Sequence, residues 1–142
     1  MKKTETMTLP ESYTVGSEES ITSVETDLVL HKSTIYFLKS DSIGQGSEEL
    51  GKVLIKSFFY TLAEADQVPG TIILLNRAVL LACEESPVLE SLLALEERGT
   101  QILSCGTCLD YYKMKEKVVS GKVSNMYTLV ELLNSATKVV SL

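Results

Sequence analysis

Cys105 and Cys108 form a Cys-x-x-Cys pair within the stretch Ile102-Leu103-Ser104-Cys105-Gly106-Thr107-Cys108-Leu109-Asp110-Tyr111-Tyr112. Two thiols at this spacing lie within reach of each other across one turn of chain. They can form a disulfide, bind a soft metal, or divide the nucleophilic and resolving roles between them. The pair predicts thiol chemistry, and by itself it leaves these alternatives open.

Composition limits the compartment and the partners. The chain has 142 residues, one domain's worth, with three cysteines, a net charge of −6 and a pI near 4.8. No apolar segment of a secretory signal follows the N-terminus and no apolar run is long enough to span a bilayer, so we expect a cytoplasmic protein without a membrane partner. The negative charge counts against nucleic-acid binding.

Residues 1–33 are rich in Thr, Ser and Glu and show neither helical nor strand periodicity, which predicts a flexible N-terminal tail ahead of a domain at 34–142. The single histidine, His31, ends this tail without a partner motif. It is typical of a solvated residue, and a Ser-His-Asp or Cys-His mechanism has little support.

Apolar runs and amphipathic segments alternate along the rest of the chain. This pattern predicts an α/β fold, a three-layer α/β/α arrangement with a mainly parallel five-stranded sheet. The segment 77–85 is ambiguous between a loop and a short helix. The expected strands are 34–40, 71–76, 101–104, 121–124 and 137–142, and the expected helices are 48–66, 86–98, one that starts inside the dithiol motif, and 126–133.

The helix at 48–66 has apolar residues at helical spacing, which predicts one buried face. A second stripe carries Lys52, Lys56 and Phe59, so we expect Phe59 on the lysine-bearing side. The predicted buried face is Leu50, Leu54, Phe58, Leu62 and Ala65.

The thiols are expected at the carboxyl edge of the sheet, where open α/β sheets bind their ligands. Thr107 and Asp110 fit a capping box, so Cys105 is predicted just ahead of a helix N-terminus that favours the thiolate, although Asp110 opposes this effect. We therefore expect a reactive Cys105. The candidate residues lining a cleft beside it are Asp41, Gly44, Gly46, Asn76, Thr107 and Asn125.

The loop Gly44-Gln45-Gly46 invites comparison with a phosphate-binding loop, but no Gly-Lys-Ser/Thr follows it. Glu48 and Glu49 already place carboxylates at the positive end of the next helix. A tight turn before an acidic helix start is the favoured interpretation.

Several chemistries compete for the dithiol. Zinc would need two further ligands, and the chain offers only Cys83 and His31, so we expect no metal and no cofactor. A thioredoxin is disfavoured because every proline precedes the motif. As a sulfur carrier, Cys105 would accept a persulfide, and Cys108 would help to release it or protect the site as a disulfide. A dithiol redox protein, a non-enzymatic binding module and two inert buried cysteines stay open.

From about Thr34 to Leu142 the chain resembles the DsrE/DsrF-like family, and within it the C-terminal domain of the YedF group of sulfurtransferase-like selenium-metabolism proteins. The resemblance implies a three-layer fold, homo-oligomers and a sulfur-relay cysteine at Cys105, with Cys83 a core or helix-flank residue outside the motif. It rests on Ser40-Asp41-Ser42-Ile43-Gly44-Gln45-Gly46, Glu49-Leu50-Gly51, Lys56-Ser57-Phe58, Ser104 to Tyr112, and Ser124-Asn125-Met126-Tyr127.

The chain departs from the YedF pattern at its start. YedF-type proteins often carry a TusA-like domain with a Cys-Pro-x-Pro motif, and nothing in residues 1–33 resembles it. Either that domain is absent or a separate partner supplies it. The resemblance thus implies a TusA-like protein or a cysteine desulfurase as a sulfur-relay partner.

Overall fold

Five parallel strands form one sheet in the order β4-β3-β2-β1-β5. In this computed structural model, residues 33–142 are described. The expected tail therefore lies outside the described residues, except for Ser33. The strands are β1 (Thr34–Leu38), β2 (Thr71–Leu74), β3 (Gln101–Cys105), β4 (Lys122–Ser124) and β5 (Lys138–Ser141).

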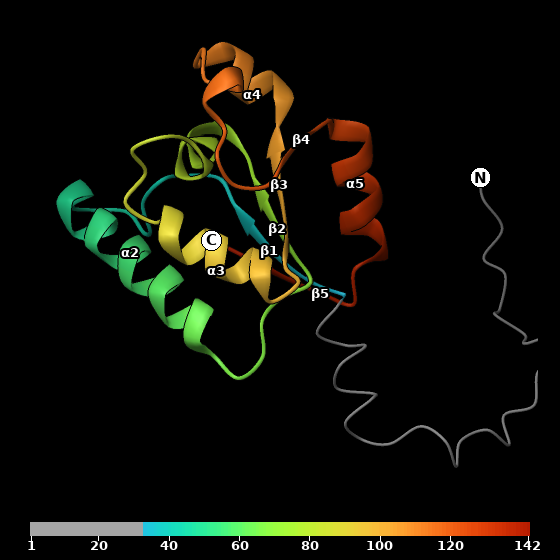
Figure 1. Ribbon diagram of the computed structural model, residues 1–142, viewed down its shortest axis with the longest axis horizontal. Helices are drawn as coiled ribbons and strands as arrows, with labels where there is room; N and C mark the ends of the chain where they lie inside the picture. The colour runs from blue at the N-terminus through green and yellow to red at the C-terminus, as the bar shows by residue number, and fades with distance from the viewer. Residues whose placement is uncertain (1–32) are drawn as a thin grey trace, which may run out of the picture.

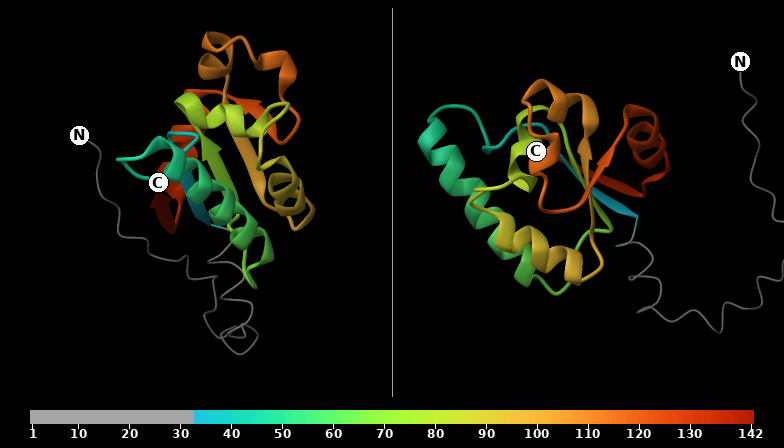
Figure 2. Two further views of the ribbon diagram at one scale, coloured as in Figure 1. Left: turned by 90° about the vertical axis from the view of Figure 1, so that its left-hand side faces the viewer. Right: turned by 45° about the horizontal axis from the view of Figure 1, so that its top comes forward.

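Helices cover both faces of the sheet, which confirms the predicted fold class. α2 (Glu48–Glu64) and α3 (Leu89–Glu97) lie on one face, and α5 (Met126–Ser135) lies on the other (Figures 1 and 2). Three short helices lie at the carboxyl end of the sheet: η2 (Asn76–Ala82), α4 (Gly106–Tyr111) and η3 (Lys115–Lys117). None of the helices in residues 33–142 is long and apolar enough to cross a bilayer.

β2 is the centre of the core. All four of its residues are buried, as the continuous apolar run at 71–76 predicts for a strand covered on both faces. The side chains of Ile72, Ile73 and Leu74 are fully removed from solvent. Burying each such side chain stabilises the fold by roughly 1.5–3 kcal/mol, so this strand gives the carboxyl edge a rigid base.

The prediction for the buried face of α2 is wrong by about one residue. The helix buries Gly51, Ile55, Phe59 and Leu62, whereas Leu50 is 55% exposed and Leu54 42% exposed. Gly51 explains why the helix is rotated about its axis relative to the prediction. The helix packs so closely against Ile43 at this position that a side chain would not fit: a Cβ on Gly51 would lie 3.0 Å from the Ile43 carbonyl oxygen. The Ile43 N–H also donates to the Gly51 carbonyl at 3.1 Å, which holds this stripe against the loop.

The start of α3 also differs from the prediction. The helix begins at Leu89, and Ser86 Oγ accepts a hydrogen bond from the Val88 N–H at 3.2 Å instead of capping a helix with Pro87 at its first position. The ambiguous segment 77–85 proves to be mostly the short helix η2, which starts directly after β2. This short connection places residues 76 and 77 at the edge where β3 ends.

Candidate thiol site

The dithiol lies where β3 passes directly into α4. Cys105 is the N-cap residue of α4 and makes no side-chain capping hydrogen bond, so the predicted capping box of Thr107 and Asp110 is wrong. The helix starts earlier because Gly106 packs tightly against β4: a Cβ at Gly106 would lie 3.1 Å from the Ser124 carbonyl oxygen. The close approach fixes both thiols relative to the sheet.

The two thiols differ in their access to solvent. Cys105 is only 2% exposed, whereas Cys108, one turn into α4, is partly exposed. Both are free thiols, as is Cys83. The thiol that an incoming reactant meets first is therefore Cys108.

Cys108 receives a hydrogen bond from the backbone. The Asn76 N–H donates to Cys108 Sγ at 3.1 Å. Burial and a hydrogen bond with the Cys105 thiol raise the pKa of Cys108, and the Asn76 N–H opposes this increase. A backbone donor aimed at a sulfur favours its charged form, so the site contains one contact suited to a thiolate.

Asn76 is itself held in an unusual conformation. Its φ of 52° lies in the left-handed region, where asparagine is tolerated better than most side chains. The Tyr112 hydroxyl donates to Asn76 Oδ1 at 2.6 Å, so the residue is bound to α4 through both its side chain and its N–H. The strand-end position of Asn76 was predicted, but its contact with Cys108 through the backbone was not.

An ion cluster lies beside the thiols. Arg77 donates to both carboxylate oxygens of Asp41, at 3.2 and 3.1 Å, and Lys52 lies 3.3 Å from Asp41 Oδ2. The Asp41 side chain is 12% exposed. Burial alone would raise the pKa of Asp41, but the hydrogen bonds and charges of Arg77 and Lys52 outweigh it and lower the pKa. Asp41 is thus an ionised anchor that ties the loop after β1 to the start of η2.

A cleft of about 420 Å³ opens next to this cluster. Its lining combines apolar side chains with the charged side chains of Asp41, Lys52, Glu84 and Glu85. Asp41 is the one predicted cleft residue that lines it, together with Lys52, Ile55, Glu84, Tyr112 and Met114 among others. Asn76 contacts this lining through its hydrogen bond to Tyr112.

The other predicted cleft residues do not line this cleft. Gly44 and Gly46 belong to the exposed loop before α2, and Thr107 is exposed on α4. Asn125 is the N-cap of α5, and its side chain accepts the Thr128 N–H at 2.9 Å. Being next to a strand end is therefore not sufficient to place a residue in the cleft.

Sequence reasoning missed Lys52, Arg77 and Tyr112. A signal existed for two of them: Arg77 directly follows Asn76 at a strand end, and Tyr112 is four residues after Cys108, on the same face of a helix. Lys52 had no comparable signal, because the rotation of α2 decides which lysine faces the loop.

Cys83 is separate from the dithiol. It is fully buried, and its Sγ donates to the Val79 carbonyl at 3.3 Å, which confirms the prediction of a core residue. Burial, with a smaller effect of Glu84, raises the pKa of Cys83, as expected for an inert thiol. Within residues 33–142, no three His, Cys, Asp or Glu side chains are grouped as a metal site would require.

The model of the DsrE/DsrF-like family matches residues 11–142. The chain belongs to the DsrE/DsrF-like family. No curated protein matches it at the sequence level. The family assignment agrees with the parallel sheet and flanking helices described above.

Solved structures share the fold of this DsrE/DsrF-like chain. The YchN protein from E. coli is 14% identical, with a TM-score of 0.53, over 77% of this chain and 98% of that one. MTH1491 from Methanobacterium thermoautotrophicum is 15% identical (TM-score 0.52; 77% and 97% covered). BT1422 from Bacteroides thetaiotaomicron is 16% identical (TM-score 0.53; 80% and 97% covered). At these identities the likeness concerns the fold alone.

Proposed function

We propose that this DsrE/DsrF-like protein is a cytoplasmic, sulfurtransferase-like sulfur-relay protein that carries a persulfide on its Cys105–Cys108 pair. The observation that carries the proposal is a partly exposed thiol, Cys108, with the Asn76 N–H on its sulfur and a second thiol, Cys105, three residues earlier at the end of β3. The family is associated with sulfur relay, which supports the same conclusion.

The burial of the two thiols bears on their roles. The sequence favours Cys105 as the sulfur-bearing residue, but Cys105 is 2% exposed and Cys108 is the thiol open to solvent. We therefore assign the receiving role to Cys108 and the resolving role to Cys105. Attack requires a thiolate that can reach its partner, and access decides between two neighbouring thiols.

The proposed reaction has two steps. The Cys108 thiolate attacks the outer sulfur of a donor persulfide, the donor's S–S bond breaks, and the donor leaves as a thiolate while Cys108 becomes the persulfide. An acceptor thiolate then attacks the outer sulfur and leaves the Cys108 thiolate behind. If no acceptor arrives, the Cys105 thiolate attacks Cys108 Sγ, which releases hydrosulfide and forms the Cys105–Cys108 disulfide.

The test is the intact mass of the full chain after incubation with a cysteine desulfurase and cysteine. The wild type should gain the mass of one sulfur atom, Cys108→Ser should gain none, and Cys105→Ser should keep the added sulfur for longer. Cys83→Ala is the matched control, because this thiol is fully buried, and it should behave as the wild type.

A wild type that gains no sulfur would contradict the relay. If Cys105→Ser abolished the gain and Cys108→Ser did not, the roles of the two thiols would be reversed. Repeating the incubation with selenocysteine tests whether the protein also carries selenium, as the resemblance to YedF-type proteins suggests.

The Cys-x-x-Cys spacing of two free thiols favours a second candidate, a dithiol redox protein. In this function the Cys105–Cys108 disulfide is the working oxidised state and not a protective by-product. A thiol titration against glutathione should then find reversible loss of both thiols near cellular potentials. Thiols that stay reduced across that range would exclude it.

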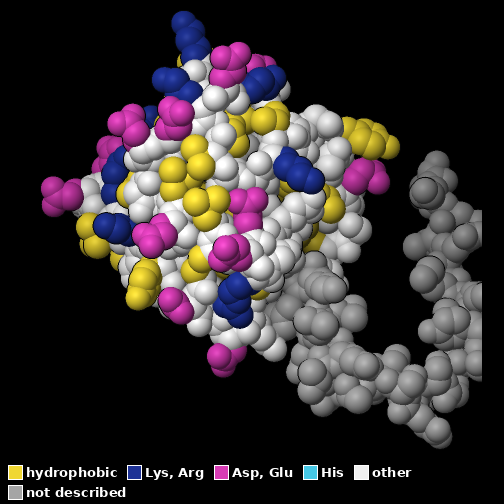
Figure 3. Space-filling model, in the orientation of Figure 1, with side chains coloured by type: hydrophobic (Ala, Val, Ile, Leu, Met, Phe, Trp, Pro, Cys, Tyr) yellow, Lys and Arg dark blue, Asp and Glu magenta, His cyan; other side chains and the backbone are white. Residues whose placement is uncertain are grey.

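We further propose a homo-oligomer, supported by exposed apolar side chains. Leu50, Val53 and Leu54 form an exposed stripe on α2, and hydrophobic side chains are visible among charged ones on the face that carries α2 and α3 (Figure 3). Sedimentation velocity should show an oligomer that Val53→Glu shifts toward monomer. Lys56→Glu introduces the same glutamate at an exposed position of α2 outside this stripe and should leave the oligomer intact. A monomeric wild type would refute the proposal.

A further inference from the structure

Tyr112 and Asn76 connect α4 to the end of β2 around the Cys108 sulfur. Tyr112 follows Cys108 by four residues, and its N–H donates to the Cys108 carbonyl at 3.1 Å, so the two side chains lie on the same face of one helical turn. Both contact Asn76: Cys108 through its sulfur and Tyr112 through its hydroxyl. Asn76, the first residue of η2, thus makes two contacts with residues at the C-terminal turn of α4, Cys108 and Tyr112.

The direction of the Asn76 N–H depends on its backbone conformation. The preceding N–H, on Leu75, continues the sheet by donating to the Leu38 carbonyl at 2.9 Å. At Asn76 the φ of 52° turns the chain, and the N–H donates to Cys108 Sγ instead of to a neighbouring strand. Residues other than glycine are rarely found in this region, so the conformation gains from support by its surroundings.

Tyr112 provides that support. Its hydroxyl donates a short hydrogen bond, 2.6 Å long, to Asn76 Oδ1. This bond joins two side chains and is not part of the backbone hydrogen bonding of a helix or strand. The Tyr112 ring is held in turn by an edge-to-face contact with Tyr111, with ring centroids 5.1 Å apart. The hydroxyl reaches Asn76 from the C-cap residue of α4.

We propose that Tyr112 is a positioning residue that acts through Asn76, holding the Asn76 N–H on Cys108 Sγ so that the sulfur is stabilised whenever it carries negative charge. That charge arises twice in the relay: on the Cys108 thiolate that attacks the donor, and on the same sulfur when an acceptor removes the outer sulfur atom. The use of this negative charge rests on the proposed function. The effect of the contact between the Asn76 N–H and Cys108 Sγ can be measured without any sulfur transfer.

The experiment measures alkylation of the full chain by iodoacetamide across pH, with each cysteine quantified by peptide mapping. Tyr112→Phe keeps the ring and removes the hydroxyl. It should move the midpoint of the Cys108 profile to higher pH and slow Cys108 alkylation at neutral pH by about threefold to tenfold, the effect of one lost hydrogen bond. Tyr111→Phe is the matched control and should leave the Cys108 profile unchanged, because it keeps the ring that contacts Tyr112 and removes only an exposed hydroxyl.

A second variant tests the route through Asn76. Asn76→Gly keeps the N–H and tolerates positive φ but removes Oδ1, so Tyr112→Phe should have no further effect in that background. An equal shift in both backgrounds, or no shift in the wild-type background, would overturn the proposal. Cys83 labelling reports unfolding in every sample, since this thiol is fully buried.

The outcome is separable from the sulfur relay because the alkylation assay contains no sulfur donor. A shifted Cys108 profile together with a wild type that gains no sulfur would retain the positioning role and reject the relay. An unshifted Cys108 profile together with normal sulfur loading would reject the positioning role and retain the relay.

Discussion

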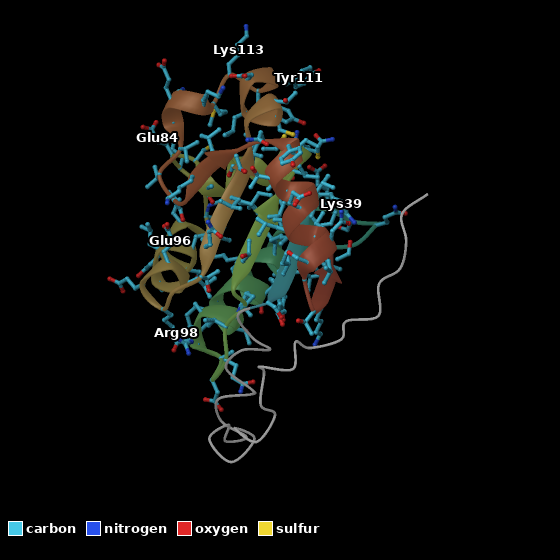
Figure 4. All side chains as sticks on the ribbon, turned by 90° about the vertical axis from the view of Figure 1, so that its right-hand side faces the viewer. Lys39, Glu84, Glu96, Arg98, Tyr111 and Lys113 are labelled. Carbon is cyan, nitrogen blue, oxygen red and sulfur yellow. The ribbon has the colours of Figure 1, made fainter. Side chains whose placement is uncertain are left out.

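The two ends of the parallel sheet are built differently. At the amino end, side chains satisfy backbone carbonyls: the Arg98 guanidinium donates to the carbonyls of Ala63, Ala65 and Asp66 where α2 ends. Figure 4 shows Arg98 and Glu96 toward one end of the strands and Tyr111 and Lys113 toward the other. The polar groups at the amino end are thus used to close the fold, and no thiol lies among them.

At the carboxyl end a backbone group instead donates a hydrogen bond to a side chain. The Asn76 N–H donates to Cys108 Sγ, and its backbone adopts a positive φ that a hydrogen bond from Tyr112 supports. Strained backbone and buried polar groups tend to gather where a fold does chemistry. Under the proposed function, stability and reactivity are placed at opposite ends of the same sheet, so mutations at the two ends should affect different measurements.

The largest effect is expected at the amino end of β4. Gly121 has a φ of 76°, and a Cβ there would lie 2.2 Å from the Ile102 carbonyl oxygen. Gly121→Ala should lower the free energy of unfolding by about 3 kcal/mol or more, because it adds both backbone strain and a clash with a neighbouring strand. Urea unfolding measures this change, and the Cys108 alkylation profile of the remaining folded protein should match the wild type.

Gly99 gives a matched control for this prediction. It also has a positive φ, 97°, but a Cβ there would meet no atom within 4 Å. Gly99→Ala should therefore cost about 1 kcal/mol, the conformational part alone. Equal losses of unfolding free energy in the two variants would show that the close approach of Gly121 to Ile102 does not add to the cost of Gly121→Ala. An altered Cys108 alkylation profile in Gly121→Ala would show that the two ends of the sheet are not independent.

Much of the fold could be predicted from local patterns. The apolar run Thr71–Leu74 is diagnostic because a parallel strand covered on both faces has no polar alternation. The buried face of α2 could not be predicted, since apolar side chains occur on several stripes of that helix and periodicity alone does not choose among them. The choice depends on Gly51, whose missing side chain lets the helix pack against Ile43.

The candidate site was predictable where it depends on strand ends and not where it depends on side-chain direction. Asp41, Asn76 and Cys105 all follow from the rule that parallel strands present their carboxyl ends at one edge. The hydroxyl of Tyr112 and the guanidinium of Arg77 reach the site only through tertiary packing. The wrong capping box at Thr107 has the same origin, because the contact of Gly106 with β4 accompanies a helix that starts two residues earlier.

A smaller effect on stability is expected at the carboxyl end, from Asp41→Asn. The carboxylate accepts two hydrogen bonds from Arg77, but Arg77 and Lys52 are each about half exposed, so solvent screens the cluster. The loss should be about 1 kcal/mol in the free energy of unfolding at neutral pH. Asp110→Asn is the matched control, since Asp110 pairs with Lys115 at the same edge but is 62% exposed, and it should change stability by less than about 0.5 kcal/mol.

The pH dependence of the Asp41 effect has a definite sign. The pKa of Asp41 is lower in the folded protein than its ordinary value, despite burial, because of Arg77 and Lys52. Its contribution is therefore fully present above the unfolded-state value, about pH 4, and is lost as the pH falls through the folded-state value. Urea unfolding of wild type and Asp41→Asn should give a constant difference between about pH 5 and 8 that shrinks below about pH 4. An Asp41→Asn variant more stable than the wild type at neutral pH, by a margin that vanishes on acidification, would mean that burial, and not the ion cluster, dominates the pKa of Asp41.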